Sequence, residues 1–286
     1  MWTRILRSVR PGALRSVYFG STYRQGFTTG YKLLPFTLAG AAAATVALYP
    51  RAVALEAPHS RLVTETKSSM ELPVYITTDA TKVSPDGVQL RLVGMGVRTV
   101  TFLGVYVYVA ALYVDEKAVA AAKPAWAAGN LDLEAQVRSW IEEGTACAVR
   151  VMPVRSTDFS HLRDGLLRTV QTRAKDARVP GAAYTLDEAG EAGVSRDVQE
   201  LKKLFPRCKV TRGQTLDLVV EKTPSGSYIL TLQHNGNTLG HVESDPVPSR
   251  AFTVPTGLLL AYMGERPDIS AALRASVAAG LQHDLP

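Results

Sequence analysis

The sequence has 286 residues, which is enough for one domain with a large apolar core and additional terminal segments. Hydrophobic residues make up 46% and charged residues 20%, as in an ordinary globular protein. The net charge of +6 comes from the N-terminus, because seven of the 32 Lys and Arg residues precede the first acid, Glu56, which leaves 25 cations against 26 acids. From that point on the chain is nearly neutral. We therefore expect no nucleic-acid partner, since phosphate binding requires clustered cations on the folded domain.

Residues 1–32 have the composition of a mitochondrial presequence. They are rich in Arg, contain Ser but no acid, and place cations between apolar residues. A disordered basic tail and a secretory signal are the alternatives. A secretory signal has an apolar stretch close behind a short charged region, whereas the apolar run here begins only at Leu33. The sequence therefore favours the mitochondrion.

Residues 33–50 form an apolar segment of 18 residues without a charge, bracketed by Lys32 and Arg51. As a helix it would extend about 27 Å, which is enough for the core of a bilayer. We interpret it as a single transmembrane anchor in the mitochondrial inner membrane, with an Ala-rich linker or an extended cleaved leader as alternatives. More cations stand on its N-terminal side, which predicts that the following domain lies in the intermembrane space. Residues 51–70 are interpreted as a linker and residues 71–286 as the folded domain.

The folded domain is predicted to alternate between strands and helices. In chain order we expect strands at 72–78, 88–101 and 105–114, helices at 115–127 and 131–143, a strand at 145–154, a helix beginning after 156–158, a helix at 194–205, strands at 216–220, 228–233 and 238–242, and helices at 249–264 and 268–282. Asn235-Gly236 is the strongest hairpin signal, because both turn positions need positive φ. The pattern indicates an α+β fold, in which helices pack on an antiparallel sheet.

Common cofactor and catalytic motifs are absent from the sequence. Gly94-x-Gly96 begins like a dinucleotide fingerprint, but the third glycine is replaced by Thr99 and the following residues are β-branched rather than helical. There is no P-loop, G-x-S-x-G, H-E-x-x-H or paired set of cysteines. Cys147 and Cys208 are too far apart for a C-x-x-C motif, and the apolar run around Cys147 favours a buried free thiol, although a disulfide is possible.

Arg98 is the one positive charge in the apolar stretch VGMGVRTVTFLGVYVYVAALYVD. Residues 102–104 make a good three-residue hairpin loop, with Gly104 in the left-handed third position. Pairing would then join 101 with 105, 99 with 107, and Arg98 with Tyr108. Tyr106, Ala110 and Leu112 are expected to share the face of Tyr108.

An arginine on an apolar sheet face needs a partner of opposite charge. A guanidinium beside a phenol is a good receptor for a carboxylate, because the guanidinium can hold both oxygens. The first hypothesis is therefore an anionic ligand in a cleft headed by Arg98. The alternatives are a structural salt bridge to a buried acid and an exposed sheet face.

Three segments together resemble the chalcone isomerase superfamily. GMGVRTVTFLGVYVYVAALYVD (94–115) is similar to its arginine hairpin, RSTDFSHLRDGLLR (155–168) to its first active-site helix, and FTVPTGLLLAYMGERPDIS (252–270) to its closing helix and turn. The resemblance covers residues 70–284 approximately, and with the leader it is most similar to a fungal mitochondrial branch. It implies an open-faced β-sandwich, a long antiparallel sheet with helices on one face and a ligand cleft between them.

The resemblance also implies a set of site residues. Arg98 matches the family's arginine, whereas Tyr108 stands where plant enzymes have a threonine, Phe159 a tyrosine, Leu166 an asparagine and Ala261 a threonine or serine. The hydroxyls and amide that would hold a ketone are therefore lost, which argues against chalcone isomerase activity. Arg98 with Tyr108 instead matches the fatty-acid-binding members of the superfamily. An intramolecular lyase or isomerase that uses Arg98 as its electrophile is the alternative, and a structural protein with a filled cleft is a third possibility.

The fungal mitochondrial branch is also described as haem-binding, so haem is a second candidate ligand beside a fatty acid. Both need an apolar cleft and a cation for their carboxylates. His161, His234 and His241 are the weak candidates for an axial ligand, and Tyr108 is a further one. His161 lies two residues after Phe159 on a helix and should face away from the cleft if Phe159 faces into it.

Overall fold

The computed structural model describes residues 61–100, 104–129, 132–248, 250–266 and 269–283. The expected presequence (1–32), the apolar segment (33–50) and the first part of the linker lie outside these residues. Within them, no helix is both long enough and apolar enough to cross a membrane.

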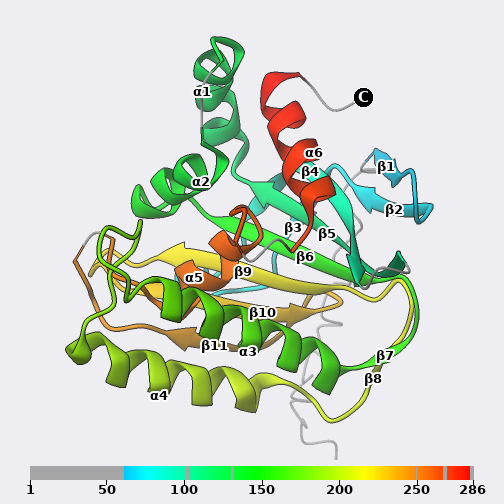
Figure 1. The fold of residues 1–286 in the computed structure, drawn as a ribbon. Coiled ribbons are helices and arrows are strands. Elements are labelled where there is room, and N and C mark those ends of the chain that lie inside the picture. Colours follow the sequence, from blue (N-terminus) through cyan, green and yellow to red (C-terminus); the bar gives the residue numbers. More distant parts are fainter. Residues whose placement is uncertain (1–60, 101–103, 130–131, 249, 267–268, 284–286) are drawn as a thin grey trace, which may run out of the picture. The chain divides into compact units, whose positions relative to one another are not determined.

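A seven-stranded antiparallel sheet forms the centre of the domain, as predicted (Figure 1). From one edge to the other its strands are β11 (Asn237–Glu243), β10 (Tyr228–His234), β9 (Leu216–Lys222), β6 (Cys147–Pro153), β5 (Val105–Val114), β4 (Gln89–Val100) and β3 (Tyr75–Thr77). Two further pairs of short strands form separate two-stranded sheets, β1 (Leu62–Glu65) with β2 (Met70–Pro73) and β7 (Thr157–Asp158) with β8 (Lys209–Val210). The Asn235-Gly236 turn has the expected positive φ at both residues, 49° and 76°.

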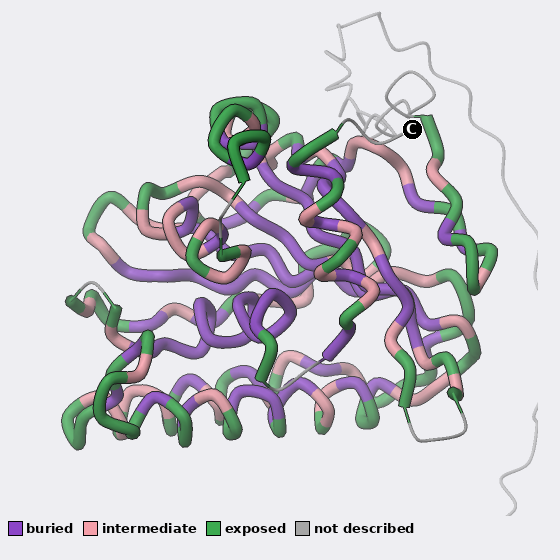
Figure 2. The backbone as a smooth tube through the Cα atoms, turned by 45° about the horizontal axis from the view of Figure 1, so that its top comes forward, coloured by how far each residue is buried: buried purple, intermediate pink, exposed green. Residues whose placement is uncertain are grey.

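Six helices pack against one face of the sheet among the described residues. They are α1 (Glu116–Ala127), α2 (Leu133–Glu142), α3 (Phe159–Asp176), α4 (Glu188–Leu204), α5 (Val254–Ala261) and α6 (Ala271–Gln282). The larger apolar core combines these helices with alternate sheet residues such as Ala110 and Leu112 of β5. Every residue of α5 is buried, and Figure 2 shows the buried backbone gathered in the middle of the sheet and in α5. The expected α+β architecture with helices on one face is therefore confirmed.

The opposite face of the sheet carries a second, smaller core. Its members include Val109, Ala111 and Tyr113 of β5, which alternate with the helix-facing residues, together with Met70 and Leu72 of β2. The β1–β2 hairpin thus covers part of this face. The prediction of a linker up to residue 70 was wrong at its end, because Leu62–Glu65 pairs with Met70–Pro73. A four-residue strand with a polar flank gives little periodicity, so the sequence alone did not reveal it.

Helix boundaries differ from the prediction where glycine and proline weaken the helical pattern. α4 begins at Glu188 rather than at 194, because Asp187 caps it by accepting a hydrogen bond from the backbone N–H of Gly190 at 2.8 Å. α5 begins at Val254 rather than at 249, with Thr253 as its N-cap. Cys147 is a buried free thiol, as expected, and Cys208 is free and exposed.

Gly94 and Gly96, the pair that resembled the start of a dinucleotide-binding motif, have a packing role instead. A Cβ on Gly94 would lie 2.4 Å from the backbone nitrogen of Val277, and one on Gly96 would lie 2.3 Å from that of Leu273. Ser270, the N-cap of α6, also donates a hydrogen bond to the carbonyl of Val97 at 2.9 Å. The two glycines therefore allow α6 to pack backbone against backbone on β4, which fixes the strand next to Arg98.

Gly96→Ala is expected to lower the free energy of unfolding by about 3 kcal/mol, because the new methyl group meets backbone atoms that cannot move without displacing α6. Gly165→Ala is the matched control. It adds the same methyl group inside α3 with no atom within 4 Å, and should raise stability by roughly 0.5–1 kcal/mol. Urea unfolding followed by circular dichroism measures both changes, and similar values for the two variants would contradict the packing argument.

Candidate functional site

The β4–β5 hairpin brings Arg98 and Tyr108 together. The two residues are direct cross-strand partners, as predicted, and Gly104 has a positive φ of 66°. The rest of the predicted register was wrong, because Thr99 pairs with Tyr106 and Val100 with Val105. A bulge leaves Val107 as an extra residue on β5 between these pairs, and bulges redirect the side chains beside them. Residues 102 and 103 of the predicted loop, and residue 101 before it, lie outside the described residues.

A chain of three polar side chains runs from this hairpin into the core. The Nη1 of Arg98 donates a hydrogen bond to the Oη of Tyr108 at 2.8 Å, and that oxygen lies 3.3 Å from the Oη of Tyr262. Arg98 is half-buried, whereas Tyr108 and Tyr262 are buried. Burial raises the pKa of Tyr262 well above that of a free tyrosine, so its phenol stays neutral. The guanidinium thus contacts the hydroxyl group of Tyr108, and the neutral phenol of Tyr262 lies beyond it.

Arg98 has no carboxylate partner among the described residues. Other arginines that are more deeply placed do have one: Arg150 donates two hydrogen bonds to Asp217, at 2.7 and 2.8 Å, and Arg173 pairs with Glu134. Because a guanidinium has five N–H donors, one bond to a phenol leaves most of Arg98 unused. The structural salt bridge considered for Arg98 is not found in the described part of the chain.

A cavity of about 180 Å³ lies between this hairpin and α3. Its wall is mostly apolar, with Arg98, Tyr108 and Tyr262 on one side and the exposed His161 and Arg168 at its edge. The remaining lining residues are Val100, Val107, Val151, Thr157, Leu162, Gly165, Leu166 and Leu216. No acid is among these lining residues, so the cavity favours an apolar molecule with a negative charge.

The structure brings only some of the expected site residues to this cavity. Arg98, Tyr108 and Leu166 line it. Phe159 does not, because its ring is buried in the core, where it packs edge-on against Phe205 and His234 with centroids 6.4 and 4.9 Å away. Ala261 is also fully buried and is not among the lining residues.

Tyr262 is the site residue that sequence reasoning missed. It follows Ala261 directly, at the C-cap of the buried helix α5. The family resemblance pointed to position 261, which is an alanine. The polar side chain at this end of α5 belongs to the next residue, Tyr262. An isolated tyrosine in the apolar run LLLAYM was the available signal, because a buried phenol needs a hydrogen-bond partner.

The three histidines have different surroundings. His161 lines the cavity, and its Nδ1 lies 3.3 Å from the Oγ1 of Thr157. It was expected to face away on the condition that Phe159 faced the cleft. Phe159 turns into the core instead, so His161, about 200° further round the helix, faces the cavity. His234 has its Nδ1 2.9 Å from the carbonyl oxygen of Thr215, and His241 is exposed on β11; neither lines the cavity.

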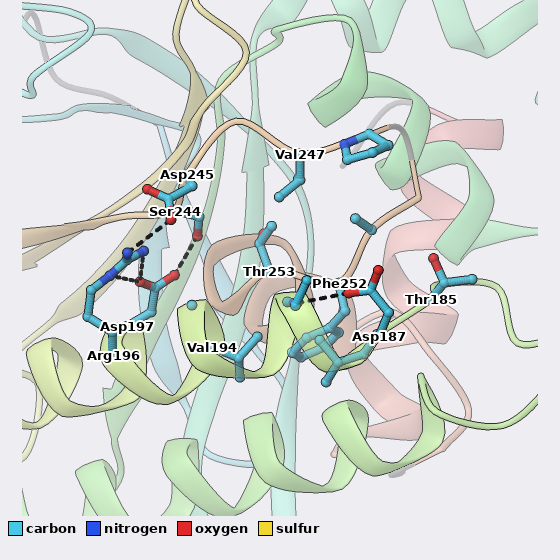
Figure 3. Close-up of a pocket in the computed structure, with 16 residues that line it drawn as sticks. Thr185, Asp187, Val194, Arg196, Asp197, Ser244, Asp245, Val247, Phe252 and Thr253 are labelled. Atoms are coloured by element: carbon cyan, nitrogen blue, oxygen red, sulfur yellow. Dashed lines mark hydrogen bonds and ion pairs between the residues drawn. The ribbon is translucent and has the colours of Figure 1, made fainter.

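A second cavity, of about 320 Å³, lies between α4 and the segment that joins β11 to α5 (Figure 3). Its charged groups already have partners: Arg196 pairs with both Asp197 and Asp245, and Asp197 also accepts a hydrogen bond from Ser244 at 2.8 Å. Asp187 accepts a hydrogen bond from the backbone N–H of Gly190. This cavity therefore lacks a charge that needs a ligand, unlike the one at Arg98, and the smaller cavity is the better candidate site.

The sequence matches the family model described as chalcone isomerase like, over residues 88–132 and 129–278. The chain belongs to the chalcone isomerase-like family. Two similar proteins are both named altered inheritance of mitochondria protein 18, mitochondrial. The one from Debaryomyces hansenii is 27% identical over 77% of this chain and 74% of its own, and the one from Lachancea thermotolerans is 26% identical over 67% and 70%.

Among solved structures, a fatty-acid binding protein from Arabidopsis thaliana has a similar fold, with a TM-score of 0.51 and 22% sequence identity. The similarity covers 78% of this chain and 100% of that chain. The chalcone isomerase-like fold expected from the three sequence segments is therefore confirmed. The candidate site lies at the arginine hairpin, inside the matched region.

Arg98→Met is expected to change the free energy of unfolding of the ligand-free protein by less than about 1 kcal/mol, because no buried carboxylate loses a partner. Arg150→Met is the matched control on the opposite sheet face. This substitution leaves the buried carboxylate of Asp217 without its partner and should lower the free energy of unfolding by about 3–5 kcal/mol. Denaturant unfolding measures both; an equally large loss for Arg98→Met would make Arg98 a structural residue.

Proposed function

We propose that this protein binds an apolar carboxylate, of the fatty-acid type, in the cavity headed by Arg98, without catalysing a reaction. The observation that carries the proposal is a half-buried guanidinium that faces only phenols at the edge of an apolar cavity. Such a group is costly to hold out of water unless an anion joins it. A carboxylate supplies that anion, and its alkyl tail supplies the apolar surface that the leucines and valines of the wall can cover.

The chemistry of the wall disfavours isomerase activity. A reaction on a ketone needs hydrogen-bond donors that stabilise the developing oxyanion. Leu166, at the position where the resemblance implies an asparagine, offers no donor to the cavity. Arg98 and the two tyrosines remain as polar groups, so an intramolecular lyase that uses Arg98 as its electrophile is the enzymatic alternative. The fatty-acid ligand named for the Arabidopsis relative supports binding over catalysis.

Haem is a second candidate because His161 and Arg98 border the same cavity. His161 would supply an axial nitrogen and Arg98 would hold a propionate, while haem itself would supply redox or gas-binding chemistry. The volume argues against it. Drug-sized ligands occupy roughly 300–1,000 Å³, and haem is at least of that size. A cavity of about 180 Å³ would therefore hold only part of the ring.

The basic leader and the mitochondrial names of the two yeast relatives support a mitochondrial location for the protein. We further propose that residues 33–50 anchor it in the inner membrane, with the domain in the intermembrane space. Protease protection of isolated mitochondria and mitoplasts tests this placement. Protection of the domain after the outer membrane is opened would contradict it.

Arg98→Ala should weaken fatty-acid binding by roughly 10- to 150-fold, the value of one charge-assisted hydrogen bond. Displacement of a fluorescent fatty acid from the full-length protein measures this. Arg155→Ala is the control, because Arg155 donates to the carbonyl of Tyr106 and is not a lining residue of the cavity. A fatty alcohol of the same length should bind wild type and Arg98→Ala alike; loss of alcohol binding in the variant would contradict the assigned role of the charge.

An absorption spectrum of the full-length protein expressed with ample haem separates the two ligands. Fatty-acid binding predicts no Soret band in the purified protein. A band that weakens in both Arg98→Ala and His161→Ala, and not in His241→Ala, would contradict the fatty-acid proposal and identify haem as the ligand. His241 is the control since it lies on β11 and is not a lining residue of the cavity.

A further inference from the structure

Gly165 occupies an unusual place for a glycine, inside the 18-residue helix α3. A glycine there makes the helix less stable than an alanine would, so its presence needs a reason. The usual reasons do not apply. Gly165 lacks the left-handed backbone that favours glycine, and an added Cβ would meet no atom within 4 Å. Gly257, by contrast, is required by the ring of Phe252, 2.3 Å from its added Cβ.

The position of Gly165 on the cavity wall gives the missing reason. It lies one helical turn from His161 and from Arg168 on the face of α3 that borders the cavity, beside Leu162 and Leu166. The free space around an added Cβ is therefore cavity space or its opening. A larger side chain at this position would fill volume that the apolar part of a ligand could use.

The cavity volume sets how much of a ligand fits. An apolar cavity of about 150 Å³ can hold benzene, which corresponds to about 25 Å³ for each carbon atom. By that measure about 180 Å³ accommodates roughly seven carbon atoms. A long-chain fatty acid is much larger, so most of its tail would remain outside the cavity.

We propose that the ligand is a monocarboxylate of about six to eight carbons, and that Gly165 and Leu166 determine this length. The inference rests on the proposed function, because it assumes that Arg98 holds a carboxylate. Gly165 keeps the space open and Leu166 limits it. Each methylene buried in the cavity strengthens binding about fourfold, and methylenes beyond it add little.

The test is a series of linear carboxylates from four to fourteen carbons, with dissociation constants for the full-length protein measured by calorimetry. Affinity should rise about fourfold per methylene up to about eight carbons and then stay level or fall. A continued rise between ten and fourteen carbons would overturn the length limit while leaving the proposed function intact. No binding at any length would overturn both.

Two variants move the limit in opposite directions. Gly165→Leu adds four carbons to the wall and should shorten the preferred chain by about three to four carbons, since each takes about 25 Å³. Leucine suits a helix interior better than glycine, so this variant is expected to fold. Leu166→Ala removes three carbons and should lengthen the preferred chain by about three.

Each variant has a matched control that leaves the cavity unchanged. Gly193→Leu makes the same change in α4, where the nearest atom to an added Cβ is a nitrogen of Arg196 at 3.9 Å. Leu167→Ala removes the same three carbons from a buried residue of α3 that is not among the lining residues. Neither control should shift the length at which affinity levels off. An unchanged limit in both Gly165→Leu and Leu166→Ala, or an equal shift in the controls, would overturn the proposal.

Discussion

The candidate site depends on one feature of Arg98. This arginine is half-buried and has no carboxylate partner among the described residues. Arg98 has one neutral partner, the phenol of Tyr108, and that phenol is itself held by Tyr262. The hydrogen bond that Arg98 donates to this phenol holds the arginine side chain in place but does not neutralise its charge. The side chain is therefore held in position, and among the described residues no acid neutralises its charge. The proposed carboxylate ligand would supply that negative charge.

The packing around the hairpin fixes that charge in place. Gly94 and Gly96 let α6 approach β4, and Ser270 at the start of α6 binds the carbonyl of Val97, the residue before Arg98. On the next strand, the bulge at Val107 lets Arg98 and Tyr108 face each other although the pairs beyond them are shifted by one residue. The buried helix α5 has Tyr262 as its C-cap and places its hydroxyl group next to that of Tyr108. The neighbouring strand β5 and two helices distant in the sequence, α5 and α6, thus determine one side-chain position.

Much of this arrangement could be predicted from the sequence because the strands carry strong local signals. The Asn235-Gly236 turn followed from its need for positive φ. The Arg98–Tyr108 pair was predicted from a loop at Gly104 that paired residue 101 with 105, whereas Val100 pairs with Val105 and the bulge at Val107 restores the predicted pair. The bulge could not be predicted, since no local sequence pattern marks the extra residue on β5. Phe159 was misplaced for a similar reason: its backbone N–H bonds the carbonyl of Cys208, a contact between segments that no local pattern reveals.

The two faces of the sheet each carry an arginine, and the two arginines have different partners. Arg150 lies on the face opposite the helices, where Asp217 on the next strand binds it through two hydrogen bonds. Arg98 lies on the helix-covered face, where neighbouring strands and helices contribute valine, leucine and tyrosine but no acid to the cavity. The same residue type is therefore neutralised on one face and left open on the other. A salt bridge for Arg98 would need an acid whose side chain reaches the guanidinium. α3 does carry two acids, Asp164 and Asp176, but neither lines the cavity. Among the described residues no acid pairs with Arg98, and this is why the proposed ligand is an anion.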